Sequence, residues 1–147
     1  MTFRSFLFGT GHTSQPTDIG LLVLRVGAGL FLAFGHGLGK IPPSDGFVET
    51  TASLGFPAPT LFAWAAALAE FVGGLCLATG FATRPAGLFV AFTLGVAAFV
   101  QHAGDPFGDR ELALVYFVIG LAFAFMGAGR YAVDAAIRRR TPAHNYT

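Results

Sequence analysis

Ionisable side chains occur within a stretch of the sequence that is otherwise apolar. The stretch reads VLRVGAGLFLAFGHGLGK and contains Arg25, His36 and Lys40. These residues share one face of a helix with Gly29 and Leu32, because the intervals between successive members are three or four residues. A guanidinium, an imidazole and an ammonium group at membrane depth could bind a ligand, carry protons or pair with acidic groups.

Glu70, in the middle of a second apolar stretch, is the predicted partner of Arg25. Residue counting at a rise of about 1.5 Å places Glu70 about 15 Å, and Arg25 about 21 Å, below the outer edge of a helical bundle. The two side chains can bridge an offset of about 6 Å. We therefore predict a buried Arg25–Glu70 ion pair, which is either part of a functional site or a clamp between two helices. The alternative for Arg25 is that its side chain extends to the cytoplasmic headgroups.

Four further polar residues are predicted near the outer mouth of the bundle, above that pair: His36, Lys40, His102 and Glu111. Together with Arg25 and Glu70 they form the candidate ligand-binding set. As alternatives, Lys40 and Glu111 suit the membrane boundary, and His102 suits the end of a helix. Two imidazoles and a carboxylate could bind zinc or iron, but no close spacing such as HxxxH is present, so no metal is predicted. Haem between His36 and His102 is a weaker alternative.

The composition indicates an integral membrane protein. Of the 147 residues, 54% are hydrophobic and 12% are charged, against about 25% charged residues in soluble domains. A soluble fold of this length could not bury so much apolar surface. The net charge of +1 argues against nucleic-acid binding. Cys76 is the single cysteine, which excludes an internal disulfide or a dithiol pair.

Four apolar segments are long enough to cross a bilayer as helices: about residues 19–39, 60–80, 85–103 and 109–128. They are too long and too continuously apolar for barrel strands, so we predict an all-α, four-helix membrane bundle. Between the first two segments, Phe47, Val48, Thr51 and Leu54 follow roughly helical spacing and predict a short interfacial helix, with an irregular loop as the alternative. Gly35 and Gly39 form a GxxxG pair, which predicts close helix packing.

The distribution of basic residues predicts the orientation. One side carries Arg4, Arg84, Arg130, Arg138, Arg139 and Arg140, and the other carries only Lys40 and Arg110. Because basic residues concentrate on the cytoplasmic side, both termini are expected there. The predicted organisation is a retained cytoplasmic tail (1–18), a four-span domain (19–136) and a basic cytoplasmic tail (137–147).

The order of several short motifs resembles the DoxX family of small four-span membrane proteins. The motifs lie between about Leu22 and Ala136 and consist of Arg25, H-G-x-x-K, G-F-P, E-F-x-G-G, T-R and G-x-G-R-Y. The resemblance implies a multi-pass protein of the bacterial cytoplasmic (inner) membrane. Some members are linked to a terminal quinol oxidase, a thiosulfate:quinone oxidoreductase or oxidant-defence complexes. The thiol chemistry of related families cannot be carried over to a chain with one cysteine.

The function expected on these grounds is that of an accessory or subunit of a quinone-linked respiratory or oxidative-stress system. His36, Lys40, His102 and Glu111 would engage a quinone headgroup and a membrane-protein partner or a second copy of the chain. No catalytic motif of a stand-alone enzyme is present. The alternatives are a small proton-coupled transporter, with Arg25, Glu70 and His36 as a polar path, and a purely structural or assembly protein.

Overall fold

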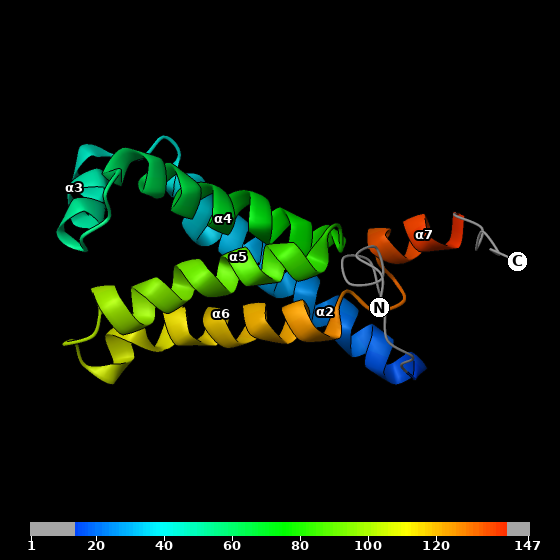
Figure 1. Ribbon diagram of the computed structural model, residues 1–147. Helices are drawn as coiled ribbons and strands as arrows, with labels where there is room; N and C mark the ends of the chain where they lie inside the picture. The colour runs from blue at the N-terminus through cyan, green and yellow to red at the C-terminus, as the bar shows by residue number, and fades with distance from the viewer. Residues whose placement is uncertain (1–13, 141–147) are drawn as a thin grey trace, which may run out of the picture.

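The computed structural model describes residues 14–140, and every regular element in that range is helical (Figure 1). In chain order the elements are α2 (Gln15–Leu32), η1 (Ala33–Gly37), η2 (Leu38–Lys40), α3 (Asp45–Ser53), α4 (Pro59–Thr79), α5 (Thr83–Val96), η3 (Ala97–Gln101), α6 (Phe107–Met126) and α7 (Val133–Arg140). Here η1 and η3 are π-helical turns and η2 is a 3₁₀ turn.

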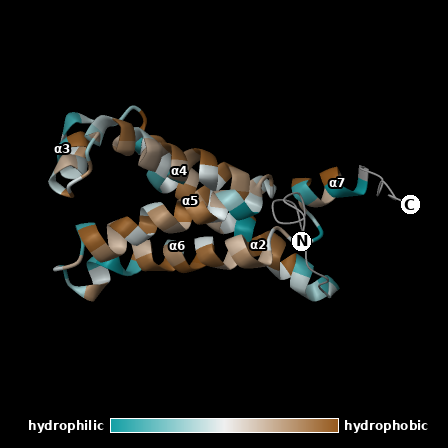
Figure 2. Cartoon of the chain, viewed as in Figure 1, coloured by the Kyte–Doolittle hydropathy of each residue, from teal (hydrophilic) through white to brown (hydrophobic). Residues whose placement is uncertain are grey.

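Three of the predicted spans are helices that are long and apolar enough to cross a membrane. They are Gln15–Lys40, Pro59–Thr79 and Thr83–Gln101. The fourth predicted segment lies in α6, which has 20 residues and carries Asp109, Arg110 and Glu111 near its start. The crossing by α6 and the orientation of the termini stay predictions. Hydrophobic residues predominate along the long helices, as expected of surfaces that contact lipid (Figure 2).

The long helices pack in chain order, with α2 and η1 on α4, α4 on α5, and α5 on α6. The buried core between them includes Leu32, Leu77, Val90 and Phe123. α4 ends where Gly80 adopts a left-handed conformation with a φ of 71°, which favours glycine. This turn brings α5 back along α4. α3 lies at one end of the bundle and α7 at the other (Figure 1).

The predicted short helix is present as α3. The Ser44 hydroxyl caps it by accepting a hydrogen bond from the Phe47 N–H at 3.3 Å. Its Thr51 is buried, and the helix packs on α4. The remaining helix, α7, was not predicted, and the expected boundary at residue 136 falls inside it. Of the predicted tails, residues 1–13 and 141–147 lie outside the described part, and α2 begins at Gln15, within the first tail.

Glycines let the helices approach closely, but not at the predicted GxxxG pair. A Cβ added at Gly35 or Gly39 would meet nothing within 4 Å, so that prediction is wrong. A Cβ at Gly37 would instead lie 2.6 Å from Phe71 Cα in α4. The π-helical turn Ala33–Gly37 explains the difference, because it widens the helix and changes the direction of the residues in it and after it.

Replacing Gly29 by alanine should therefore destabilise the bundle. A Cβ at this position would lie 2.5 Å from Gly74 O and 2.7 Å from Ala78 N, so α2 and α4 would have to separate. We expect a loss of about 1–3 kcal/mol in the free energy of unfolding, measured by SDS titration in mixed micelles. Gly27→Ala is the matched control in the same helix, because its Cβ would meet nothing within 4 Å. Equal stability of the two variants would contradict the packing argument.

Candidate functional site

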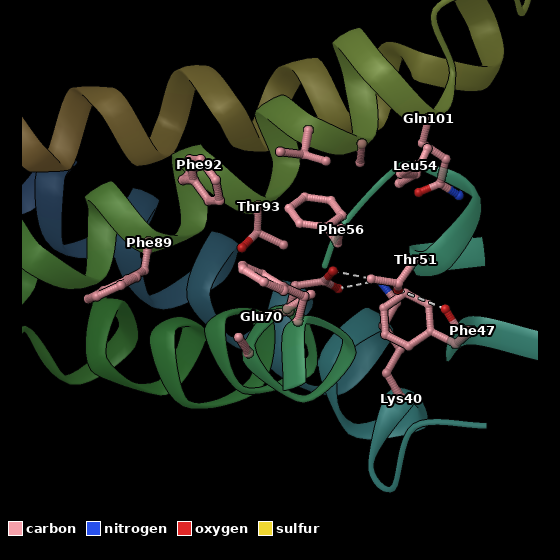
Figure 3. A pocket seen from close by; sticks show the side chains of 15 residues that line it. Lys40, Phe47, Thr51, Leu54, Phe56, Glu70, Phe89, Phe92, Thr93 and Gln101 are labelled. Atoms are coloured by element: carbon pink, nitrogen blue, oxygen red, sulfur yellow. Dashed lines mark hydrogen bonds and ion pairs between the residues drawn. The ribbon is translucent and has the colours of Figure 1, made fainter. Parts of the chain in front are cut away.

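A cavity of about 240 Å³ lies beneath α3, between α4 and α5 (Figure 3). We call it the α3 pocket. Its wall is mainly aromatic and aliphatic, with the polar side chains of Thr51, Thr93 and Gln101 added, and its two charged residues are Lys40 and Glu70. The phenylalanines in the wall are Phe47, Phe56, Phe62, Phe89 and Phe92. Few polar groups in an apolar wall are typical of small-molecule sites.

Lys40 and Glu70 form an ion pair within this pocket. The Lys40 Nζ atom lies 2.5 Å from Glu70 Oε1 and 2.7 Å from Oε2. The Glu70 side chain is 3% exposed, whereas that of Lys40 is 35% exposed. Lys40 Nζ also lies 5.6 Å from the centre of the Phe47 ring, within cation–π range. Lys40 thus balances the charge of a buried carboxylate and remains accessible from the pocket.

The local packing of the first helix places Lys40 over Glu70. Gly37 allows η1 to approach the backbone of α4 at Glu70 and Phe71. Lys40 follows about one turn later in η2, from which its long side chain reaches the carboxylate. The second π-helical turn, η3, adds Ala97 and Gln101 to the pocket wall. Both π-helical turns therefore occur near the pocket, and such turns are frequent at functional sites.

The predicted Arg25–Glu70 pair is wrong. Arg25 is 2% exposed, and its Nη1 atom donates to the carbonyl oxygens of Ala78 at 2.5 Å and Leu77 at 3.4 Å. Its Nη2 atom donates to the carbonyl oxygen of Tyr131. The alternative of a side chain extending to the headgroups is excluded by the same burial.

The error arose from the assumption that the first helix ends, and the second begins, at the same outer level. Gly37 packs against Glu70, so these two residues are at the same level of the bundle. The part of α4 from Thr60 to Glu70, about 15 Å long, therefore extends beyond Gly37. Arg25 lies twelve residues before Gly37, about 18 Å along its own helix. The two charges are therefore at different levels of the bundle.

Arg25 instead belongs to a polar cluster at the α7 end, which we call the arginine clamp. Asp134 Oδ1 accepts from the Ala82 N–H at 2.7 Å, and Oδ2 accepts from the Thr83 N–H at 3.0 Å. Asp18 Oδ1 accepts from the backbone N–H of Arg130 at 2.9 Å. The clamp joins α2, the α4–α5 turn and the segment that leads into α7.

The two aspartates of the clamp were missed by the sequence analysis. Asp18 precedes Arg25 by seven residues, or two helical turns, so it extends the face already identified. Asp134 is the single acidic residue after the last apolar segment. Both residues lie outside the interiors of the apolar segments, where a buried charge is most conspicuous in the sequence.

The other predicted site residues do not gather around Lys40. The His36 ring packs edge-on against Tyr116 of α6, with 6.0 Å between the ring centres. His102 Nδ1 lies 2.7 Å from Asp105 Oδ2 in an exposed turn, and Glu111 is exposed on α6. None of these three residues lines the α3 pocket. Within residues 14–140, no three His, Cys, Asp or Glu side chains are grouped so that they could hold a metal ion.

Comparison with known proteins agrees with the presence of apolar, membrane-crossing helices. The DoxX family model matches residues 20–103. "Putative oxidoreductase CatD" of Bacillus subtilis (strain 168) is 32% identical over 122 residues, which are 82% of this chain and 89% of that protein. Inner membrane protein YphA of Escherichia coli (strain K12) is 38% identical over 110 residues, 74% of each chain.

A third relative matches this chain over nearly the whole of its own length. Inner membrane protein YqjF of Escherichia coli (strain K12) is 33% identical over 131 residues, which are 84% of this chain and 95% of that protein. No solved structure matches the chain. The family model and these relatives together cover all the elements that form the α3 pocket. The chain belongs to the DoxX family and is a multi-pass membrane protein.

Proposed function

We propose that this protein is an accessory or subunit of a membrane redox system and that its α3 pocket binds a quinone headgroup. It resides in the bacterial inner membrane, as YphA and YqjF do by name. The name of CatD supports a connection with oxidation–reduction chemistry. A membrane-protein partner would supply the catalytic centre, because the sequence carries no motif of a stand-alone enzyme. The chain would contact that partner or a second copy of itself.

The proposal includes four membrane spans, with α6 as the fourth. The charged residues near the start of α6 would then lie at the membrane boundary, and its remaining residues are apolar. The arginine-rich α7 end would face the cytoplasm under the positive-inside rule. The α3 pocket, at the opposite end, would lie near the outer surface of the membrane.

The observation that carries the proposal is a paired ammonium and carboxylate in an aromatic-walled pocket. An ammonium group has three N–H donors, and two of them can serve the Glu70 oxygens. The third can donate to a quinone carbonyl, and Glu70 can accept from the hydroxyl of the reduced form. The proposed ligand contacts are therefore Lys40 and Glu70 in place of His36, His102 and Glu111.

The proton-coupled transporter has less support. Its polar path required contact between Arg25 and Glu70, which the structure does not make. His36 is directed at Tyr116. A purely structural role would explain the arginine clamp, but it gives no reason for an aromatic pocket around a charged pair.

Quinone binding by the purified protein in nanodiscs tests the proposal. We expect decylubiquinone and its reduced form, decylubiquinol, to bind the parent chain, and Glu70→Gln to weaken binding of decylubiquinol about tenfold, because its hydroxyl loses a charged acceptor. Glu111→Gln is the matched control, since Glu111 is exposed and outside the pocket. In cells, Glu70→Gln should raise oxidant sensitivity, whereas Glu111→Gln should not. Absence of quinone binding together with unchanged oxidant sensitivity would refute the proposal.

A further inference from the structure

A second cavity lies beside the α3 pocket along the bundle. Phe89, at the edge of the α3 pocket in Figure 3, also lines a groove of about 390 Å³ between α4 and α5. We call the second cavity the α4–α5 groove. Its wall on α4 runs from Leu68 to Cys76 and includes Ala69, which is next to Glu70 in the sequence. The two cavities thus border the same side chain, Phe89, and are lined by the neighbouring residues Ala69 and Glu70 of α4.

The α4–α5 groove is apolar and opens to the outside of the bundle. Among the residues that the structure describes, no charged side chain lines it. Val72 and Phe89, at its edges, are 46% and 66% exposed. Because the outward surface of a membrane-spanning helix contacts acyl chains, the groove opens into the hydrocarbon layer. Its length from Ala69 to Cys76 is about 10 Å, which suits part of a hydrocarbon tail.

We infer that the site takes a lipid-soluble molecule with a neutral, oxygen-bearing head and a hydrocarbon tail, and that this molecule enters from the bilayer. The head occupies the α3 pocket beside Lys40 and Glu70, and the tail follows the α4–α5 groove past Phe89. The inference deepens the proposed function and rests on ligand binding in the α3 pocket. It adds that the tail is recognised and that the ligand comes from the membrane.

The charged pair favours a neutral head. Lys40 and Glu70 already balance each other across 2.5 and 2.7 Å. A phosphate would compete for Lys40 and leave the Glu70 carboxylate, which is 3% exposed, without its cation. A zwitterionic headgroup would have to separate the pair. A quinone ring can accept a hydrogen bond from Lys40 without displacing Glu70.

The cavity volumes agree with a ligand divided between two compartments. The α3 pocket alone, at about 240 Å³, is smaller than the roughly 300–1,000 Å³ of typical small-molecule sites. The groove supplies the additional apolar space. A further groove between α5 and α6 also borders the pocket, at Phe92 and Val96, but it includes no residue of α4, the helix that carries Glu70. We therefore assign the tail to the α4–α5 groove.

Three valine-to-phenylalanine variants test this path with decylubiquinone and its tailless headgroup as probes. Val72 lines the α4–α5 groove, Val100 lines the α5–α6 groove, and Val118 of α6 lines none of these cavities. All three are exposed, at 46%, 51% and 60%, so the added ring should be tolerated. Ala69→Leu, at the pocket end of the α4–α5 groove, is a second blocking variant.

In the parent chain, decylubiquinone should bind at least about tenfold more tightly than the tailless headgroup. Val72→Phe and Ala69→Leu should remove most of that advantage and leave binding of the tailless headgroup unchanged, whereas Val100→Phe and Val118→Phe should have no effect.

Equal binding of the two probes, or loss of the advantage in Val100→Phe alone, would overturn the inference while leaving the proposed function intact. Displacement of decylubiquinone by phosphatidylethanolamine would also overturn it. Tail-dependent binding with no oxidant phenotype in Glu70→Gln would support the inference and count against the redox role.

Discussion

Replacing Arg25 by leucine is expected to lower the free energy of unfolding by about 3–5 kcal/mol. The guanidinium donates hydrogen bonds to carbonyl oxygens of Leu77, Ala78 and Tyr131, within a part of the bundle where Arg25 is 2% exposed. Two of these carbonyls belong to the last turn of α4, where a helix lacks internal donors and favours a cation. Leu77 O also accepts from the Gly80 N–H at 3.1 Å, so leucine would leave chiefly the carbonyls of Ala78 and Tyr131 without a donor. Each buried group that is left unsatisfied costs about 1–3 kcal/mol.

The effect of Arg25→Leu can be measured by SDS titration with circular dichroism as the readout. Arg130→Leu is the matched control, because the Arg130 side chain is exposed. Arg25→Lys should recover only part of the stability, since an ammonium keeps the charge but not the planar arrangement of donors. Surface substitutions usually change the free energy of unfolding by no more than about 0.5 kcal/mol. If Arg25→Leu and Arg130→Leu differed by no more than that, the hydrogen bonds of the clamp would contribute little to stability.

The helices could be predicted from the sequence because lipid imposes a strong pattern. A membrane-crossing helix requires a long apolar segment, and the runs ending near Lys40, Gly80 and Gln101 met that requirement. α3 was found because its apolar residues repeat at helical spacing. α7 was not found, because a search for long apolar segments passes over an eight-residue helix with three arginines.

The site was predicted less well because residue counting gives a position along one helix and not the register between two. Glu70 was correctly selected as a buried charge that needs a partner, and that partner is Lys40. Their pairing was missed because it depends on the close approach of Gly37 to α4, on the π-helical turn before it and on the length of the lysine side chain. His36 was assigned to the same site because regular helical spacing was assumed through that turn.

The two ends of the bundle differ in how their charges are used. In the arginine clamp, the hydrogen bonds of Arg25 and Asp134 go to backbone groups, which fixes the chain path between helices. In the α3 pocket, Lys40 and Glu70 bind each other and border open volume. The first arrangement suits stability, and the second leaves donors and acceptors within reach of a ligand. Loss of either member of the second pair should therefore affect both folding and binding.

Replacing Lys40 by methionine is expected to lower the free energy of unfolding by about 2–4 kcal/mol. The change leaves the Glu70 carboxylate, which is 3% exposed, without its cation. The loss should lie below the largest values for buried pairs, because the Lys40 side chain is 35% exposed and its charge is partly screened by solvent. In the Lys40→Met/Glu70→Gln double variant most of the stability should return, since no unpaired charge remains. A double-mutant cycle measured by SDS titration would then give a coupling of about 2 kcal/mol.

A second measurement separates this pairing from general misfolding. Lys40 is the single lysine in the sequence, so an amine-reactive reagent reports on one side chain besides the N-terminus. In the folded parent chain the ion pair should slow acylation of Lys40, and Glu70→Gln should speed it several-fold, because Lys40 Nζ is then no longer held against both carboxylate oxygens. Glu49→Gln is the control, since Glu49 is exposed on α3, the helix that covers the pocket. Additive effects in the cycle together with equal acylation rates in the two Gln variants would show that Lys40 and Glu70 do not act as a pair.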